Sequence, residues 1–202
     1  LAALTKCAQL PLHFWLPHAS AGPVTANALM QSVTTVVAGI YVLLRFAFLL
    51  ETAPAALELL IAAGSATMLL ASLAAATQLD LSRLLALTTS SVMGLVLVGI
   101  GVGAYSTAAF LLLTHGFVKA LLLLASGVVL TTLKGESDLR KMGGLSQRMR
   151  WTQGVFGLGA LALVGFPPFA NFFPIEELLA FLWISERPES DLVLMVAIAS
   201  FG

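Results

Sequence analysis

The sequence predicts an all-α protein: a polytopic transmembrane helix bundle in which some helices are discontinuous. Of the 202 residues, 59% are hydrophobic and only 10% are charged, whereas a soluble domain carries about 25% charged residues. The apolar residues form runs of about 20 or more, the length that crosses a bilayer core as a helix. Because these runs lack the alternation of a membrane barrel, helices are the expected way to satisfy the backbone in lipid.

Charged residues and helix breakers divide residues 1–202, taken as one transmembrane domain, into five full spans and two partial ones. The first partial span ends near Leu12, and the last begins near Leu192. The full spans cover, in order, residues 25–50, 55–77, 84–103, 107–133 and 151–184. Since the chain begins at Leu1 and stops at Gly202 inside apolar runs, we expect it to be a fragment of a longer protein.

The distribution of charge predicts the orientation of the helices. The polar loop 134–150 holds half of all the lysines and arginines, and these residues accumulate on the cytoplasmic side of a membrane. Residues 185–191 are net acidic, which suits the opposite side. Alternation of the spans then places 12–24, 78–83 and 134–150 on the cytoplasmic side, and 51–54, 104–106 and 185–191 on the other.

Two of the spans contain residues that can interrupt a helix. The middle of the last full span holds four breakers: Gly165, Pro167, Pro168 and Pro174. Proline removes a backbone donor and clashes with the preceding turn, and a break survives in a membrane only inside protein or beside a hydrated cavity. We therefore predict a real break there. Polar residues near the start of the first full span allow either a second break or close helix packing through small residues.

Lys119 is the strongest candidate for a functional residue, because it lies far from both ends of an apolar span. An ionisable group in such a place costs about 2.5–3.5 kcal/mol even on lenient insertion scales, so it normally faces protein or water and has a function. His115 lies four residues earlier and projects from the same helical face. We interpret the two as a proton relay; the alternative is a structural lysine paired with a carboxylate on another helix.

Three more ionisable residues are candidates for the proton path. Lys6 can lead into the path or simply reach the membrane surface from a helix end. Glu176 and Glu177 follow the predicted break. They can pass protons onward, or stabilise the start of a half-helix through its dipole.

Other polar residues favour structural interpretations. His13 and His18 flank Trp15, a pattern typical of the membrane–water interface. Proton uptake through these histidines is the less favoured interpretation. Asp80 and Arg83 lie close together in the sequence and are interpreted as an ion pair in a loop.

Several classes of function are excluded. The formal net charge is zero, so nothing predicts a nucleic-acid partner. The single cysteine, Cys7, rules out a disulfide within the chain and a multi-cysteine metal site. No nucleotide, haem, flavin or iron–sulfur motif is present. We therefore expect no cofactor and no redox site on this chain, so that any electron transfer belongs to other subunits.

Three segments resemble the antiporter-like subunits of respiratory complex I. They are LTKCAQLPLHFWLPHASAGPVTANALMQSVTTVVAGIYVLLR, THGFVKALLLLASG with the later DLRKMGGL, and NFFPIEELL. The resemblance keeps order and spacing over about residues 4–180 and is nearest to the distal, largest subunit of that group. The same family includes subunits of multisubunit cation/proton antiporters, membrane-bound hydrogenases and inorganic-carbon transporters.

This resemblance implies part of an inverted-repeat antiporter-like fold, with two broken helices, proton half-channels and a polar axis along the membrane. It implies that Lys6 matches a lysine of the first half-channel. Lys119 matches the central lysine of the family, and His115 the histidine one turn before it. Gln31 matches a position in the first broken helix.

The chain departs from the family at four of its polar positions. Gln31 and Leu111 stand where the family has histidines, Ile175 where it has an exit lysine, and His18 where it has an aspartate. Hydrated gaps could replace the missing groups, Glu176 could serve as the exit residue, or the channel could be partly disabled. Of these, we favour Glu176.

The resemblance thus predicts a proton-translocating subunit of a respiratory NADH:quinone oxidoreductase, placed in a bacterial inner (plasma) membrane beside other membrane subunits. Protons are the expected substrate, with Na+ as the alternative. Two other functions stay open: a subunit of a cation/proton antiporter or carbon-uptake complex, and a structural membrane spacer with a degenerate channel.

Overall fold

The computed structural model describes residues 1–19, 22–185 and 190–201, and this part of the chain is helical without a β-strand. The helices, including one π-helix and one 3-10 helix, follow in this order: α1 (Ala2–Lys6), α2 (Trp15–Ala19), α3 (Val24–Leu29), η1 (Met30–Thr34), α4 (Thr35–Arg45), α5 (Ala47–Glu51), α6 (Pro54–Ala76), α7 (Leu81–Val102), α8 (Tyr105–Thr132), η2 (Leu139–Lys141), α9 (Leu145–Arg148), α10 (Arg150–Val164), α11 (Phe172–Ile184) and α12 (Ser190–Phe201).

Four of the described helical stretches are long and apolar enough to cross a membrane: Ala26–Arg45, Pro54–Ala76, Leu81–Val102 and Tyr105–Thr132. They agree with four of the five predicted full spans. The fifth predicted span, residues 151–184, is divided into α10 and α11, each too short to cross by itself. The all-helical transmembrane bundle with discontinuous helices is therefore confirmed.

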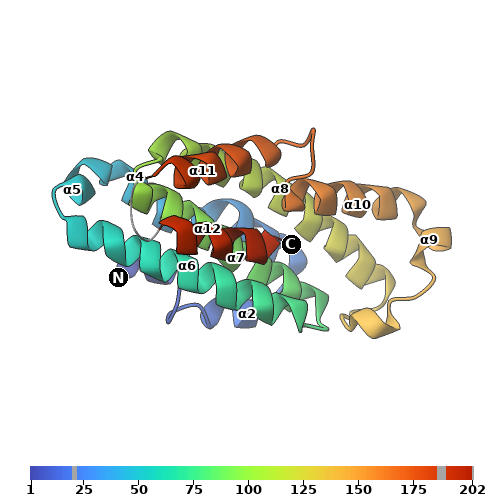
Figure 1. Ribbon diagram of the computed structural model, residues 1–202. Coiled ribbons are helices and arrows are strands. Elements are labelled where there is room, and N and C mark those ends of the chain that lie inside the picture. The colour runs from blue at the N-terminus through green and yellow to red at the C-terminus, as the bar shows by residue number, and fades with distance from the viewer. Residues whose placement is uncertain (20–21, 186–189, 202) are drawn as a thin grey trace.

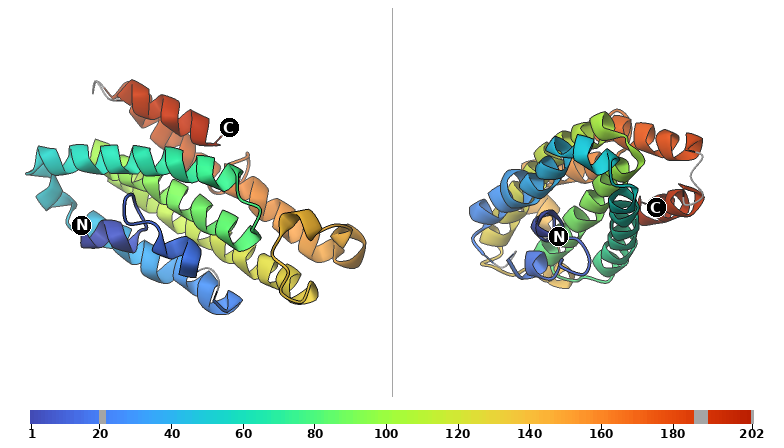
Figure 2. Two further views of the ribbon diagram at one scale, coloured as in Figure 1. Left: turned by 90° about the horizontal axis from the view of Figure 1, so that it is seen from below. Right: turned by 90° about the vertical axis from the view of Figure 1, so that its left-hand side faces the viewer.

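Helix α7 is the centre of the bundle. It packs along α6 on one side and α8 on the other, with α2 and α4 also against it, and nearly its whole length is buried. In Figure 2, α6, α7 and α8 run alongside one another through the length of the molecule. A helix that is hydrophobic all round is expected in such an interior position.

The contact between α6 and α7 depends on two glycines. A Cβ atom added to Gly64 would lie 2.6 Å from the carbonyl oxygen of Gly94, and one added to Gly94 would lie 2.6 Å from that of Gly64. Small residues at a crossing point let two helix backbones approach closely, which is how helices associate when lipid removes the hydrophobic drive. This crossing holds α7 in place for the contacts described below.

Local signals in the sequence explain where α7 begins and ends. The side chain of Asp80 accepts a hydrogen bond from the backbone N–H of Arg83, at 3.0 Å, which caps the helix. Gly103 ends it with a left-handed φ of +92°. The second carboxylate oxygen of Asp80 accepts from Ser137. Within the described residues Asp80 and Arg83 make no side-chain ion pair, so that prediction is wrong: the carboxylate is used as a cap instead.

Two of the predicted boundaries near the N-terminus are wrong. The first partial span does not continue to Leu12, because α1 ends at Lys6 and Ala8 takes a left-handed φ of +53°. The predicted span 25–50 ends as a long helix at Arg45, and the remainder forms the separate short helix α5. Apolar composition alone does not reveal these turns, although Pro11 is a signal against a helix that continues to Leu12.

The break in the last full span is confirmed. Helix α10 ends at Val164, Gly165 turns the chain with a φ of +78°, and Pro167 and Pro168 follow before α11 begins at Phe172. Pro174 is not part of the break, contrary to the prediction. It is the third residue of α11, in the first helical turn, where a missing N–H costs nothing. The last partial span, predicted to begin near Leu192, corresponds to α12, which is described from Ser190 onward.

The described parts of the three loops predicted to share the cytoplasmic side lie together in the structure. The N–H of Leu81 donates to the carbonyl of Ser137 at 3.1 Å, and that of Leu139 to Leu79 at 2.8 Å, so segments 78–83 and 134–150 are joined. Segment 12–24 meets them in a shared cavity. In Figure 1 segment 134–150, which contains α9, lies at the end of the molecule opposite α5. We call this the loop end of the bundle.

Candidate functional site

Lys119 lies in the middle of α8 and is fully buried, with an exposed fraction of 0%. Its Nζ donates hydrogen bonds to the carbonyl oxygen of Leu85 at 2.5 Å and to Oγ1 of Thr88 at 2.6 Å, both on α7. Both partners are neutral, and no carboxylate pairs with Lys119 among the described residues. The structural alternative, a lysine paired with a carboxylate on another helix, is thus not seen within the described part of the chain.

The pattern of α8 explains why this lysine faces inward. Residues spaced three and four apart share one side of a helix, and in α8 one such side is buried: Ala108, Leu111, Leu112, His115, Val118, Lys119 and Leu122. The opposite side carries exposed large apolar residues such as Phe110, Leu113 and Phe117. Lys119 is thus carried into the bundle by the apolar residues around it.

His115 lies on the same buried face, one turn before Lys119. Its exposed fraction is 1%, and in the described part of the chain neither ring nitrogen has a hydrogen-bond partner. The predicted juxtaposition of His115 and Lys119 on one helical face therefore agrees with the structure. Their role as a relay remains a prediction.

Gln31 is buried in the π-helix η1, so the first full span is irregular at this residue. Its Nε2 donates to Oδ1 of Asn27 at 2.6 Å, and its Oε1 accepts from Oγ1 of Thr89 at 3.2 Å. The side chain of Ser32 donates to the carbonyl of Ala28. Such side-chain bonds compete with the helical ladder, and π-helical turns are frequent at functional sites.

Gln31 and Lys119 are brought to the same turn of α7. Lys119 binds the carbonyl of Leu85 and the hydroxyl of Thr88, whereas Gln31 binds the hydroxyl of Thr89. The hydroxyl of Thr89 also lies 3.0 Å from the carbonyl of Leu85. A continuous set of hydrogen-bonding groups therefore joins the π-helix to the central lysine.

Residues Thr88–Ser91 of α7 are functional candidates that the sequence reasoning did not single out. Successive helical residues point about 100° apart, so the four hydroxyl residues face different neighbours. Thr88 contacts α8 and Thr89 contacts η1; Ser91 donates to the carbonyl of Met68 on α6 at 3.1 Å. Four consecutive hydroxyl residues inside an apolar span were the available signal.

A cavity of about 540 Å³ opens at the loop end. Its lining includes the charged residues Asp80, Arg83 and Lys134 and the polar residues Asn27 and Ser126. Asn27 belongs both to this wall and to the hydrogen bond with Gln31. The cavity is therefore connected, through Asn27 and Gln31, to the turn of α7 that holds Lys119.

The other predicted path residues lie away from this centre. Lys6 is exposed, in the last turn of α1, where its Cβ approaches Gly39 of α4. Glu176 and Glu177 are both exposed on α11. Neither glutamate lies in the first turn of α11, so the interpretation that they stabilise the start of this half-helix is wrong. None of the three contacts Lys119 through a described hydrogen bond or ion pair.

Asn171 is a second residue that the sequence reasoning missed. It ends the break between α10 and α11, and its exposed fraction is 0%. Neither atom of its amide has a partner among the described residues. An amide just before two phenylalanines and just after a proline-rich break was the signal in the sequence.

The residues predicted to mark the interface have structural contacts. Nε1 of Trp15 donates to the carbonyl of Thr5 at 2.8 Å, which fixes α2 against α1. Nδ1 of the exposed His18 lies 2.7 Å from the carbonyl of Phe14. The ring of His13 stacks at a tilt on that of Phe14. None of these groups reaches the Lys119 centre.

Within the described residues, no three His, Cys, Asp or Glu side chains form a group that could hold a metal ion. The centre consists instead of one lysine, one histidine, two amides and several hydroxyl groups. All of these groups can bind water, and the lysine and the histidine can also carry protons.

Residues 1–201 match the family model described as "NADH:quinone oxidoreductase/Mrp antiporter, TM". The chain is 42% identical over 173 residues to NADH-ubiquinone oxidoreductase chain 5 of Dugong dugon, covering 86% of this chain and 29% of the relative. It is 42% identical over 185 residues to the protein of the same name from Aedes aegypti, covering 92% and 32%. The chain thus spans less than a third of the length of these curated relatives.

Two solved structures are similar in fold. One is the Mrp complex from Dietzia sp. DQ12-45-1b, with a TM-score of 0.88, 26% sequence identity, and coverage of 98% of this chain and 38% of that chain. The other is the membrane-bound sulfane sulfur reductase, an archaeal respiratory membrane complex, with a TM-score of 0.85, 25% identity, and coverage of 98% and 42%.

Proposed function

The chain belongs to the NADH:quinone oxidoreductase/Mrp antiporter family of transmembrane proteins, and from this premise we propose that it is a proton-translocating, antiporter-like part of a respiratory NADH:quinone oxidoreductase. The names of the curated relatives support that complex. The observation that carries the proposal is Lys119, an ammonium group fully buried in a membrane helix among neutral partners.

The geometry suggests how a proton would reach this lysine. The loop-end cavity supplies water as far as Asn27. From there the hydrogen bonds of Gln31 and Thr89 lead to the turn of α7 that binds Lys119. The amide of Gln31 does not ionise near neutral pH, so it orients its neighbours, and the protons move on water and on Lys119.

The partners of Lys119 suggest how its charge would change. The carbonyl of Leu85 accepts a hydrogen bond from the ammonium group as well as from the neutral amine, and the hydroxyl of Thr88 can donate or accept. Both states of the lysine can therefore be bound at the same place. Electron transfer in other subunits would alter the electrostatic potential along the membrane, and with it the proton affinity of Lys119. No cofactor on this chain is part of the proposal.

Other membrane subunits and the lipid bilayer are the proposed partners. Large apolar side chains are exposed on several helices, including Phe117, Leu124, Trp183 and Ile184, and such surfaces in a membrane protein face lipid or other helices. The chain is an integral membrane protein, and the membrane that we propose for it is the bacterial inner (plasma) membrane. Similarity to the archaeal respiratory membrane complex supports a prokaryotic respiratory membrane.

A cation/proton antiporter is the second candidate function, because the fold is similar to that of the Mrp complex. In this case Na+ would move against protons. Proton flux that depends on added Na+ would favour the antiporter over the respiratory pump. Flux driven by NADH oxidation without Na+ would favour the pump.

Lys119→Met tests the proposal in the full-length protein within its assembled complex. We expect proton translocation in proteoliposomes to fall at least about a hundredfold, the lower end of the effect of a positioned proton-transfer group, while assembly is retained. Lys141→Met is the matched control, since Lys141 is an exposed loop residue paired with Glu136. Unchanged translocation in an assembled Lys119→Met complex would leave only the structural spacer.

A further inference from the structure

His115 and Asn171 are two buried polar side chains, from different helices, whose polar atoms have no partner in the described chain. Both nitrogens of the imidazole and both polar atoms of the amide are unpaired, and neither residue is more than 1% exposed. Buried polar groups in proteins are hydrogen-bonded in the great majority of cases, to protein or to ordered water. Four such atoms without partners therefore require an explanation.

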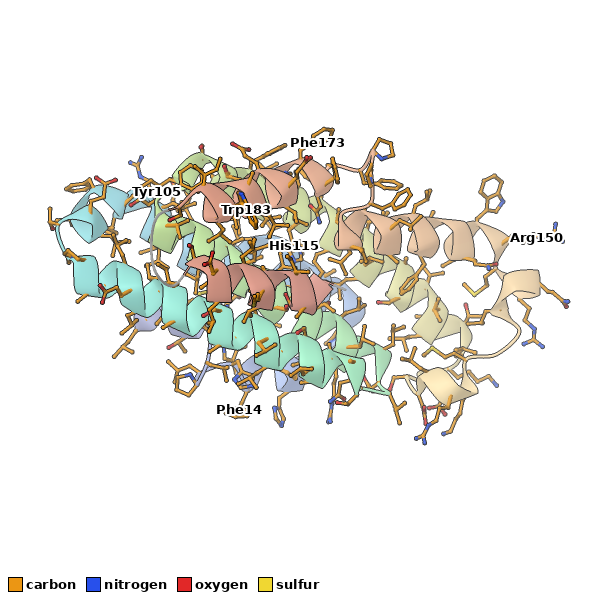
Figure 3. All side chains as sticks on the ribbon, viewed as in Figure 1. Phe14, Tyr105, His115, Arg150, Phe173 and Trp183 are labelled. Atoms are coloured by element: carbon orange, nitrogen blue, oxygen red, sulfur yellow. The ribbon has the colours of Figure 1, made fainter. Side chains whose placement is uncertain are left out.

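The packing of α8 against α11 places these two residues at the same level of the bundle. A Cβ atom on Gly99 of α7 would lie 2.6 Å from Leu178 of α11 and 3.3 Å from Ala108 of α8, so these two side chains meet there. The two helices run in opposite directions. In Figure 3, Tyr105 and Trp183 lie toward the end near α5, and His115 and Phe173 lie nearer the middle.

From that shared point, equal steps along the two helices reach His115 and Asn171. His115 follows Ala108 by seven residues, and Asn171 precedes Leu178 by seven, a displacement of about 10.5 Å along each helix. Seven residues are two helical turns, so each lies on the same face as its starting residue. The intervening Leu111 and Ile175 are buried in one core cluster. Asn171 and His115 therefore lie at about the same level of the bundle, on the sides of their helices that meet near Gly99 of α7.

We propose that Asn171 is a positioning residue that, together with His115, holds water at the break between α10 and α11. A buried water molecule typically makes two to four hydrogen bonds. The amide offers both a donor and an acceptor, and so does a neutral imidazole. Water between them satisfies the amide and the ring nitrogen that points toward it, which the described side chains do not do.

The helix break provides further polar groups for this water. Pro167 and Pro168 have no N–H, so carbonyl groups in the turn before them lose their usual donors. In a membrane such a break is tolerated where it lines a hydrated space. His115 is one turn from Lys119, so this water lies next to the central lysine, on the side of the break.

This inference rests on the proposed function, since it assigns the water a place in the proton path. Helix α11 has the buried Ile175 one turn after Asn171, and this side chain cannot carry a proton. Water held by Asn171 bypasses Ile175 and gives protons a route from the His115–Lys119 pair into the break. Glu176, the exposed neighbour of Ile175, is the next ionisable group along α11.

A density map of the full-length protein in its assembled complex, at a resolution that shows ordered water, tests the site directly. We expect density within hydrogen-bond distance of both the Asn171 amide and the His115 ring. A dry contact between the two side chains, or a direct hydrogen bond between them, would overturn the inference.

Transport measurements on variants of the same complex test the role of the water. Asn171→Leu has nearly the same size but no polar atom, and we expect proton translocation to fall about tenfold, the upper end of the effect of losing one hydrogen bond between neutral groups. Asn171→Ser keeps a polar group and leaves room for one more water, so it should retain most of the activity. Ala170→Leu, at an exposed neighbour, is the matched control and should have no effect.

The outcomes separate this inference from the proposed function. If Lys119→Met abolishes translocation while Asn171→Leu leaves it unchanged, the function stands and the positioning role of Asn171 is wrong. If Asn171→Leu and Asn171→Ser are equally impaired in assembled complexes, the residue is needed for packing and the inference is also wrong. If Lys119→Met has no effect, the proposed function fails, and the density map alone decides whether the water is bound.

Discussion

A membrane lysine held by neutral oxygens differs from one held by a carboxylate. An ion pair stabilises the charged form, and removing one partner leaves an uncompensated charge. The carbonyl of Leu85 and the hydroxyl of Thr88 stabilise Lys119 by hydrogen bonds alone. This leaves the protonation of Lys119 responsive to charges elsewhere in a complex, which a transport residue requires.

Thr88 is therefore predicted to tune the central lysine. Thr88→Val keeps the shape of the side chain but removes the hydroxyl that accepts from Lys119 Nζ. We expect proton translocation to fall about tenfold, since a hydrogen bond to a charged group contributes about 1.5–3 kcal/mol. Thr88→Ser keeps the hydroxyl and serves as the control. A Thr88→Val complex that pumps at the normal rate would show that Leu85 alone holds the lysine.

At the scale of helices, the polar centre depends on how closely the backbones approach. Gly64 and Gly94 let α6 and α7 touch, and Gly116 of α8 approaches the carbonyl of Ser32 in η1, at 2.9 Å from its added Cβ. The second contact lies beside Gln31 and one residue from His115. Small residues thus set the register in which the hydroxyl groups of α7 meet their partners.

Gly94→Val is predicted to disrupt this packing. The new side chain would overlap the backbone of Gly64, and overpacking of a filled site costs about 1–3 kcal/mol. The thermal unfolding of the purified protein in detergent should shift to lower temperature. Gly154→Val makes the same change in α10, where an added Cβ meets nothing within 4 Å. Equal stability of the two variants would contradict the importance of the α6–α7 crossing.

The loop 134–150 contains two exposed ion pairs. Lys141 lies 2.9 Å from Glu136, and Arg140 lies 3.2 Å from Asp138. A hydrogen bond from Lys141 lowers the pKa of Glu136, and one from Arg140 lowers the pKa of Asp138, while Glu136 raises the pKa of Lys141. These pairs are exposed to solvent, so their contribution is small and screened by salt.

These shifts predict how the loop responds to pH. An acid whose pKa is lowered by folding stabilises the folded loop at pH values above the ordinary pKa of that acid. This stabilisation is lost as the pH falls through the lowered pKa. The loop should stay ordered at neutral pH and loosen below about pH 4. The raised pKa of Lys141 also stabilises the folded loop at neutral pH. That contribution is lost only when the pH rises to strongly alkaline values.

A spin label at Gly143→Cys can measure how the mobility of loop 134–150 changes with pH. An added Cβ there meets nothing within 4 Å, and the native Cys7 is buried. The label should gain mobility on acidification, and less so in a Glu136→Gln background, where the paired carboxylate is already absent. Equal mobility at neutral and acidic pH would count against the ion pairs.

At the scale of the whole molecule, the loops are sorted into two ends of one bundle, and the charge of segment 134–150 predicts which end is cytoplasmic. Two exposed positions, Gln147 at the loop end and Ala53 at the opposite end, can report the orientation. We expect a membrane-impermeant maleimide to label Gln147→Cys only from the cytoplasmic side and Ala53→Cys only from the other. Labelling of both from the same side would refute the orientation.

Much of the candidate site was predictable because it is local. Lys119 and His115 are four residues apart, so helical periodicity alone puts them on one face. The break at Gly165 to Pro168 was predictable because the backbone chemistry of glycine and proline acts on the nearest turn. The burial of Lys119 and His115 inside a bundle was predictable from the free-energy cost of exposing ionisable groups to lipid.

The chain by itself determined which segments are helices, where the last span breaks and which ionisable residues must lie inside. Only the tertiary structure decided that Lys119 binds neutral atoms on α7, 31 and 34 residues away, that Lys6 and Glu176 lie outside this centre, and that Asn171 is fully buried. The reason is physical. Helix formation and breaking depend on neighbours within a turn, whereas the meeting of two helices depends on side-chain shapes distant in sequence, as at Gly64 and Gly94.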